Sequence, residues 1–577
     1  MHGTVTIGNA TQGPIGSVLL DGDELSEYTL SMDGRPLSFT QPLLYDRAFF
    51  GFFRSRYDTA PFRLYTLPHP LAPGDTADIA VSSIVRTPGI PNGLYGTKML
   101  RNGFFFTGGL PELGYDDDDE VSSPYLRRKN HLPPKPDDDE IAQDDPIGIR
   151  TLKAGKSGHL MNIDLTISTD GDQTAIGQGD LVKQWQEGGR NYFHYVLDNP
   201  GYYPPTIALS ARYAHYTDSI RLDHTIYINV FYDPAHGVNL QRFVAGYKDA
   251  LRYYSQAYGP YPYNSISLAE ANSYGPRQGS TATLDYLPEY FGWNGRFTNA
   301  DQFDYCYYSA ARLLSQQWWR FQVAPNETQG SLDIPEGLSH YDGLVMAEHK
   351  YGKDNVSWLL RQELQFYGFL RRRQEDKDAP LIRAKYWFVW EGKAAVALYG
   401  LRDLIGEDSI DAALRQFKAE FAYRAAGPYA GANDLFRCLK AHTPDSIQYY
   451  LNDTWLRMTL YDNRTVSVLA TPTGRPDEYK VTLNVHAGKH WIDEKGKETE
   501  AVNMADYIDI GIFGANTVNK ATGRDQTNPL FLRKYKLSAG DHTFTLIVHG
   551  KPDWAGIDPY NKLIETRPGD SRKSFKQ

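Results

Sequence analysis

The chain has 577 residues, of which 41% are hydrophobic and 23% are charged, a composition typical of globular proteins. This length is too great for a single hydrophobic core, so we expect about three or four domains. The formal net charge of −10 offers no electrostatic attraction to nucleic acid or to anionic lipid, and neither is expected as a partner. No run of about 18 apolar residues is present, so no membrane span is predicted. The first residues also lack the basic and then apolar pattern of a signal peptide.

Three further features of the composition are compatible with more than one structure. The 41 tyrosines suit half-hydrated surfaces such as clefts, but they are equally typical of many β-strands. The two cysteines, Cys306 and Cys438, are expected to be buried free thiols, with a single disulfide bridge as the alternative. The acidic runs at 116–120 and 137–140 are typical of solvated loops.

Residues 1–235 show the pattern of a β domain. Hydrophobic and polar residues alternate at 163–167 and 225–230, and clusters of Gly, Pro and Asp separate such runs. The stretch 115–145 is rich in Pro and Asp and is predicted to be a long surface loop.

Residues 236–463 show a helical period instead. In the stretch 238–258, Phe243, Tyr247, Leu251 and Tyr254 fall on one helix face, and Gly259-Pro260 ends the helix. A short strand is expected at 265–269. Further helices are expected at 301–321, 335–350, 353–374, 384–405, 408–421, 431–441 and 445–458.

The period returns to two in residues 464–577. Clear strands are predicted at 480–485 and 543–548, which indicates a small β-sandwich. The fold class is therefore a multidomain α+β protein. Its expected domains are an N-terminal β domain at 1–235, a mostly helical domain at 236–463 and a C-terminal β domain at 464–577.

Several short motifs resemble those of the gluzincin aminopeptidases, the membrane alanyl aminopeptidase family of zinc peptidases. They are residues 251–254 with 258–262, Gln317-Trp318-Trp319, Glu336-Gly337 and residues 401–408. The closest resemblance is to the peptidase-like half of bacterial ABC-transporter permease fusions, through residues 380–383, 460–464 and 508–511. It implies a saddle-like or sandwich N-terminal β domain, a thermolysin-like helical domain and an Ig-like C-terminal β domain. It also implies a peptide or protein ligand, a membrane transporter partner and an extracytoplasmic location.

The zinc motif of that family is degenerate in this chain. A gluzincin carries His-Glu-x-x-His on a helix, so that both His face one zinc ion and the Glu between them serves as general base. Counting back from Trp318, the first His position is Arg312, the base is Leu313 and the second His is Gln316. Glu336 keeps the position of the third ligand. The resemblance therefore implies that no catalytic residue is intact and that the zinc cofactor is lost.

Two further family features are also changed. The position of the tyrosine that stabilises the oxyanion falls at Glu391, beside Trp390, and a carboxylate there would repel a developing oxyanion. The loop that binds the substrate amine corresponds to the stretch that begins at Gln278, and Glu289 is expected near the cleft. At least one of Trp318 and Trp319 is expected to pack in the core.

Arg312 suggests what replaces the metal. Arg312 and Gln316 are four residues apart on one helix face, which is expected to face Glu336. Our hypothesis is that an Arg312–Glu336 ion pair occupies the former metal site, because a guanidinium supplies positive charge and binds a carboxylate well. Alternatively, Arg312 points to solvent and Glu336 caps a helix. A rival hypothesis is a rebuilt metal site on Glu336 and His340, with Glu348 and His349 nearby in sequence.

Three functions remain open at this stage. The leading one is a catalytically inactive aminopeptidase-like domain that binds a ligand in the cleft through Arg312, Gln316, Glu336, His340, Gln278, Glu289 and Trp390. The second is an active metallo-aminopeptidase or other hydrolase with a rebuilt metal site. The third is a structural interaction module with a filled cleft.

Overall fold

The structure of the chain is a computed structural model. It describes residues 2–575 apart from 10, 22–26, 42, 47–55, 60–61, 85–98, 101–102, 108–111, 115–123, 135–140, 154–159, 203–206, 272–277, 296–302, 374–377, 385, 494–496 and 519–524. The two acidic runs at 116–120 and 137–140 lie outside these described residues.

The first β unit has a small core of its own. One of its sheets has the order β1 (His2–Gly8), β9 (Thr76–Ile84), β3 (Glu27–Met32) and β4 (Arg35–Pro36). The other has the order β12 (Glu112–Leu113), β2 (Ile15–Asp21), β8 (Phe62–Leu71) and β5 (Phe39–Thr40), and β6 (Leu43–Asp46) pairs with β7 (Arg56–Thr59). Buried residues alternate along β9, and they contribute to a core separate from the rest of the molecule.

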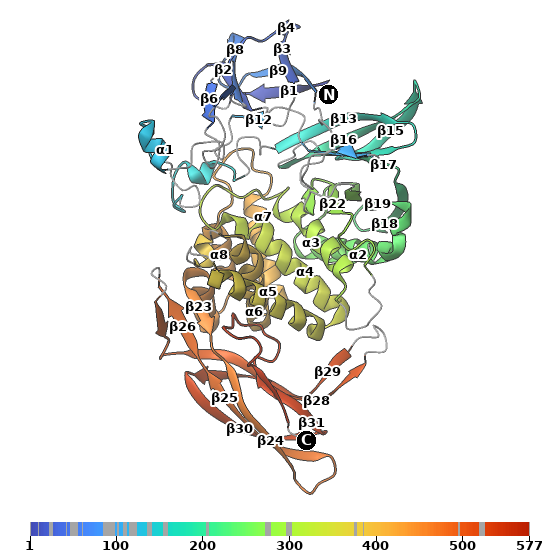
Figure 1. The fold of residues 1–577 in the computed structure, drawn as a ribbon. Helices are drawn as coiled ribbons and strands as arrows, with labels where there is room; N and C mark the ends of the chain where they lie inside the picture. The colour runs from blue at the N-terminus through green and yellow to red at the C-terminus, as the bar shows by residue number, and fades with distance from the viewer. Residues whose placement is uncertain are drawn as a thin grey trace.

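A second β unit lies between the first unit and the helices (Figure 1). One of its sheets has the order β13 (Leu160–Asp170), β16 (Arg190–Tyr202) and β15 (Asp180–Glu187). The other sheet has the order β10 (Met99–Leu100), β11 (Gly103–Thr107), β17 (Ile207–Ala211) and β14 (Thr174–Ile176). The short helix α1 (Pro124–Lys129) and the 3-10 turn η3 (Gly148–Arg150) lie in the connections. The β character expected of this part of the chain is confirmed.

A five-stranded sheet covers one side of the helical region. Its order is β18 (Ala214–Arg221), β19 (Thr225–Tyr232), β20 (Ser265–Ala271), β22 (Leu284–Pro288) and β21 (Gly279–Thr281). Strands β19, β20 and β22 are parallel, and every residue of β20 is buried. The sheet joins strands from both sides of residue 235, where the sequence places a domain boundary.

The helices of the central region follow the predicted order closely. They are α2 (Leu240–Ala257), α3 (Tyr305–Trp319), α4 (Pro335–Tyr351), α5 (Lys353–Arg373), α6 (Ala394–Ile405), α7 (Glu407–Phe421), α8 (Ala432–Ala441) and α9 (Gln448–Leu451). Short turns connect them: η4 (Pro234–Asn239), η5 (Ser331–Asp333), η6 (Leu381–Arg383), η8 (Asp445–Ile447) and the π-helical turns η7 (Val389–Lys393) and η9 (Asn452–Leu456). The helix expected at 384–405 therefore starts at η7, which runs directly into α6.

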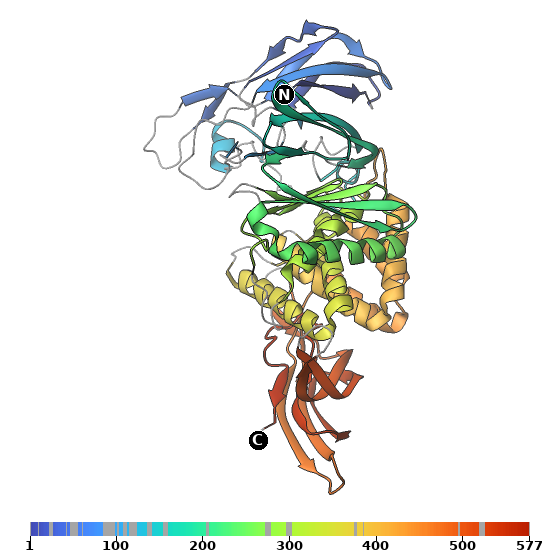
Figure 2. The same cartoon turned by 90° about the vertical axis from the view of Figure 1, so that its right-hand side faces the viewer.

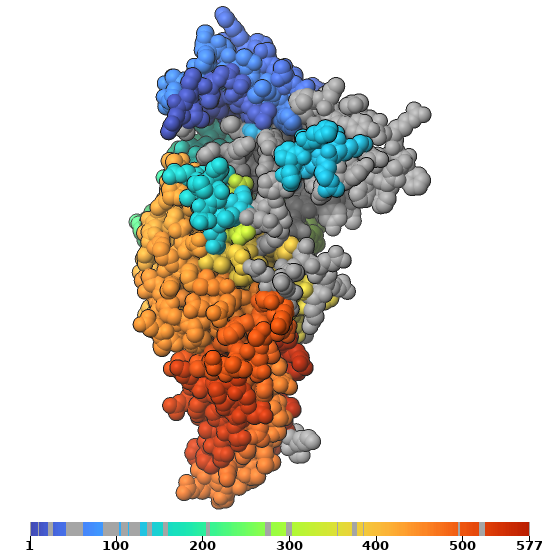
Figure 3. Space-filling view, turned by 90° about the vertical axis from the view of Figure 1, so that its left-hand side faces the viewer, coloured from blue at the N-terminus to red at the C-terminus, as the bar shows by residue number. Residues whose placement is uncertain are grey.

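The C-terminal β domain extends from the helices at the opposite end from the first β unit (Figures 2 and 3). Its sheets have the orders β23 (Met458–Tyr461), β26 (Lys489–Ile492), β27 (Glu498–Glu500); β24 (Arg464–Pro472), β25 (Glu478–Ala487), β30 (Gly540–His549); and β29 (Asp525–Ser538), β28 (Ala505–Val518), β31 (Pro552–Ile557), β32 (Arg572–Ser574). One continuous apolar core runs from the helices into this domain.

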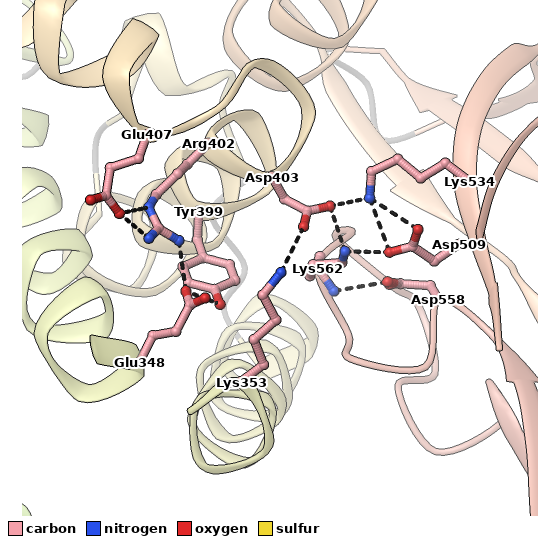
Figure 4. Close-up of polar contacts among 10 residues, drawn as sticks. All are labelled: Glu348, Lys353, Tyr399, Arg402, Asp403, Glu407, Asp509, Lys534, Asp558 and Lys562. Carbon is pink, nitrogen blue, oxygen red and sulfur yellow. Dashed lines mark hydrogen bonds and ion pairs between the residues drawn. The ribbon is translucent and has the colours of Figure 1, made fainter. Parts of the chain in front are cut away.

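Buried and half-buried charges also join the helices to the C-terminal domain. Asp403 of α6 contacts Lys534 of β29 and Lys562, and both lysines contact Asp509 of β28 (Figure 4). We call these four residues the seam cluster.

Three smaller expectations can be compared with the structure. Trp318 and Trp319 are both fully buried, so the prediction that at least one packs in the core is confirmed. Cys306 and Cys438 are buried and free. Within the described ranges, no helix is long and apolar enough to cross a membrane.

Candidate functional site

Helix α3 carries the positions that the sequence resemblance aligns with the zinc motif. Asp304 caps its first turn by accepting a hydrogen bond from the Tyr307 backbone N–H. Leu313 is buried in the core, and its aliphatic side chain has no atom that can serve as a base. Arg312 and Gln316 lie one turn apart, and the Arg312 side chain is only 11% exposed.

The Arg312–Glu336 ion pair predicted from the sequence is present. Glu336 lies in the first turn of α4, after Pro335, and its Oε2 is 3.6 Å from Nη2 of Arg312. A helix N-terminus also favours a carboxylate. The alternative in which Arg312 points to solvent is therefore wrong.

Glu336 has a second partner, Arg320, that was not predicted from the sequence. Its Nη2 donates a hydrogen bond to Glu336 Oε1. A signal for it existed, because Arg312, Gln316 and Arg320 follow one another at steps of four, the spacing of one helix face. Burial alone would raise the pKa of Glu336, but Arg320 and Arg312 outweigh burial and lower that pKa below its ordinary value.

His340 lies one turn after Glu336, between two further carboxylates. Its Nδ1 is 3.6 Å from Oε1 of Glu363 on α5, and its Nε2 is 3.9 Å from Oε2 of Glu391 on η7. The hydroxyl of Tyr308 on α3 is 3.4 Å from Nδ1. Glu363 was not singled out from the sequence, where it is one charge among many on an amphipathic helix.

The π-helical turn η7 places Glu391 in this group. Burial raises the pKa of Glu391 against the opposing effect of His340 and Arg312. Close packing holds η7 on α4, since a Cβ on Gly337 would lie 2.9 Å from Ala394 Cβ and 3.1 Å from the carbonyl oxygen of Trp390. Trp390 itself is half-buried.

The remaining two predicted cleft residues have no hydrogen bond or ion pair to this group among the described residues. Gln278 precedes β21 and is half-buried. Glu289 follows β22, and its charge acts on His236, which contacts Glu270 at 2.5 Å. In the described part of the chain, no hydrogen bond or ion pair joins Gln278 or Glu289 to Glu336.

The rival metal site on α4 is not assembled. Glu348 contacts Arg402 at 2.6 Å and His349 contacts Glu407 at 2.9 Å (Figure 4 shows Glu348, Arg402 and Glu407). Glu348 lies 12 residues beyond Glu336, about 18 Å along the helix at a rise of 1.5 Å per residue. That hypothesis is wrong for Glu348 and His349, because Arg402 and Glu407 hold them at the other end of α4.

The donor set around Glu336, where the sequence resemblance places a zinc ligand, does not fit the metal. A zinc ion needs unprotonated nitrogen, sulfur or oxygen ligands at about 2.0–2.3 Å. Here two guanidinium groups already neutralise Glu336, and one of them stands at a ligand position. Among the described residues, no group of three His, Cys, Asp or Glu is arranged to hold a metal ion.

Known structures show what fold the chain has. It matches no family model and no curated protein by sequence. It is similar to the M1 zinc metallopeptidase from Deinococcus radiodurans, with 15% identity and a TM-score of 0.51 over 78% of this chain and 88% of that one. It is also similar to Legionella pneumophila aminopeptidase A in complex with aspartic acid, with 12% identity and a TM-score of 0.56 over 98% of this chain and 57% of that one. The chain therefore has the multidomain architecture of the M1 zinc aminopeptidases, the fold that the sequence resemblance implied.

Proposed function

We propose that the chain is a catalytically inactive, aminopeptidase-like binding module. The observation that supports this most directly is that Arg312 and Arg320 both contact Glu336, where the fold would carry zinc. Leu313 in the core offers no base for activating water, and Glu391 offers no donor to an oxyanion when it is ionised.

The proposed ligand is a peptide or an amino acid held in the former active-site cleft. The Legionella enzyme of the same fold binds aspartic acid. In this chain, Arg312, Glu391 and His340 bring polar groups of both charges to one place. From the sequence resemblance we further propose an extracytoplasmic location and a membrane transporter as partner, which fractionation and cross-linking in the native cells would test.

Metal content tests the proposed inactivity. The purified chain is dialysed against micromolar zinc, washed, and counted for zinc per chain by plasma mass spectrometry, with an active M1 zinc peptidase treated in parallel. We expect close to one zinc in the control enzyme and close to none in this chain. One zinc per chain, together with release of amino acids from peptides, would refute the proposal.

A hydrolase with a rebuilt site is the second candidate function. The observation in its favour is a buried histidine between two carboxylates, an arrangement that can transfer protons. Peptide hydrolysis that persists with a metal chelator present and is lost in His340→Gln would support it.

A further inference from the structure

One face of α5 lies against the C-terminal β domain. Asp354, Ser357 and Arg361 follow one another at steps of three and four residues, which places them on this face. Asp354 accepts hydrogen bonds from the backbone N–H and the hydroxyl of Thr527 on β29. Ser357 accepts one from Arg572 on β32. Arg361 lies one turn further along the same face.

The guanidinium group of Arg361 has no acceptor. Its Nε atom is buried without a hydrogen-bond partner, and no ion pair forms at Arg361 in the part of the chain that the structure describes. Glu363 is near in sequence, but two residues turn a helix by about 200°, and Glu363 faces His340 on another side of α5. A buried N–H that lacks an acceptor is costly, so Arg361 is suited to take one from a ligand.

Arg572 is held beside Arg361 by neutral groups. Its Nε donates a hydrogen bond of 2.6 Å to the carbonyl oxygen of Pro559, and its Nη2 donates one of 2.9 Å to Oγ of Ser357. Its Cζ lies 4.7 Å from the centre of the Trp554 ring. Burial, together with the nearby positive charge of Arg361, lowers the pKa of Arg572 to about 10. Two like charges therefore lie close together, and the contacts that fix Arg572 do not neutralise them.

Two carboxylates whose charges act on Arg572 are bound elsewhere. Asp354 is occupied by Thr527, and Asp558 is buried and accepts backbone N–H groups. Among the described residues, no ion pair joins a carboxylate to either of the two arginines. An anion from outside the chain can therefore supply the missing counter-charge.

We propose that Arg361 and Arg572 bind one phosphate group between α5 and the C-terminal domain. A guanidinium binds phosphate oxygens through paired N–H groups, and a phosphate with two negative charges compensates both arginines. A single carboxylate leaves one positive charge uncompensated. Because the phosphate accepts hydrogen bonds from α5 and from β32, it stabilises the contact between the two domains. The site is separate from the group around Glu336 and goes beyond the proposed function.

Calorimetric titration of the wild-type chain tests the site. The probes are inorganic phosphate, phosphoserine, acetate and chloride at pH 8 and constant ionic strength. At this pH phosphate is mainly a dianion, and the pKa of Arg572, about 10, keeps that guanidinium charged. We expect phosphate to bind about tenfold or more tightly than acetate or chloride. Equal affinity for phosphate and acetate would overturn the proposal.

Phosphoserine distinguishes the two sources of a phosphate group. Affinity equal to that of inorganic phosphate would show that the site admits a phosphate ester. Affinity lower by about tenfold or more would identify free phosphate as the ligand. Both results support the site, since each requires that phosphate binds.

Arg361→Met places the binding at this site. The substitution should weaken phosphate binding about tenfold or more. It should not lower the melting temperature without phosphate, because Arg361 has no ion pair in the described chain to lose. Arg437→Met is the matched control, since it removes an arginine that is paired with Glu420, and it should leave phosphate affinity unchanged. Full phosphate affinity in Arg361→Met would overturn the proposal.

Thermal unfolding with millimolar phosphate needs no variant. A ligand that binds only the folded chain raises the melting temperature. The helices and the C-terminal domain share one apolar core, so phosphate should raise their joint transition and leave that of the first β unit, which has its own core, unchanged. Chloride at equal ionic strength is the reference, so that screening is the same. A rise of both transitions, or an equal rise in chloride, would show a general effect of salt and overturn the site.

Discussion

Glu336 is stabilised from two positions on one neighbouring segment. Arg312 lies on α3 and Arg320 directly follows the last residue of α3, and both reach the carboxylate at the start of α4. Taking charges out of water is costly, so such a group is stable only while the charges compensate one another. The effect of a substitution therefore depends on what it leaves unpaired.

Removal of the carboxylate should be more damaging than removal of one guanidinium. Glu336→Gln removes the one carboxylate that both Arg312 and Arg320 contact and is expected to lower the free energy of unfolding by about 3–5 kcal/mol. Arg312→Met removes an ion pair of 3.6 Å but leaves Glu336 its hydrogen bond from Arg320, so it should cost less, about 1–3 kcal/mol. Urea unfolding at pH 7 measures both, and a larger loss in Arg312→Met than in Glu336→Gln would contradict this account.

The same group predicts a pH dependence. Since Arg320 and Arg312 hold the pKa of folded Glu336 below its ordinary value, its contribution to stability is present above the unfolded pKa of about 4.3. The contribution is lost as the pH falls through the lower, folded pKa. The difference in unfolding free energy between the wild type and Glu336→Gln should therefore narrow between pH 7 and pH 3. A constant difference over this range would show that Glu336 acts through packing alone.

At the scale of elements, periodicity predicted the helices well and contacts between helices poorly. The step of four on α3 is visible in the sequence and led to the Arg312–Glu336 pair. Nothing in the sequence indicates that Glu363 turns from α5 toward His340, because that contact depends on how α4 and α5 cross. The π-helical turn that presents Glu391 is equally hidden, since a hydrogen-bond register has no residue signature.

Gly337 tests the contact that positions η7. Gly337→Ala would place a Cβ 3.1 Å from the carbonyl oxygen of Trp390 in η7 and 2.9 Å from Cβ of Ala394, where α6 begins, so η7 and the start of α6 must move away from α4. Overpacking of this kind costs about 1–3 kcal/mol and exceeds the gain in helix propensity. Thermal unfolding measures the loss.

Gly16→Ala is the control for this change. The glycine lies in β2 of the first β unit, where an added Cβ meets nothing within 4 Å. It should leave the free energy of unfolding unchanged, within about 0.5 kcal/mol. Equal effects of the two variants would remove the argument that close packing positions η7.

At the scale of the whole molecule, two motifs far apart in the sequence meet in the seam cluster. Residues 401–408 and 508–511 both resembled family motifs without a visible role. In the structure, Asp403 of the first motif and Asp509 of the second share Lys534 and Lys562 (Figure 4). Burial would raise the pKa of Asp403, but the two lysines hold it well below its ordinary value.

The seam cluster therefore sets the stability of the helical and C-terminal domains together. Asp403→Asn leaves Asp509 as the one carboxylate in ion-pair contact with both lysines and is expected to lower the free energy of unfolding by about 3–5 kcal/mol. Because one apolar core crosses the seam, calorimetry should show the joint transition of the two domains moving to lower temperature without splitting. The first β unit has a separate core, so the temperature of its own transition should not change.

Arg437→Met is the control for this change. It breaks the ion pair between Arg437 and Glu420, whose side chains are 50% and 33% exposed, and should lower the free energy of unfolding by at most about 1 kcal/mol. A split of the joint transition in Asp403→Asn would show that these charges, rather than the shared core, make the two domains unfold together.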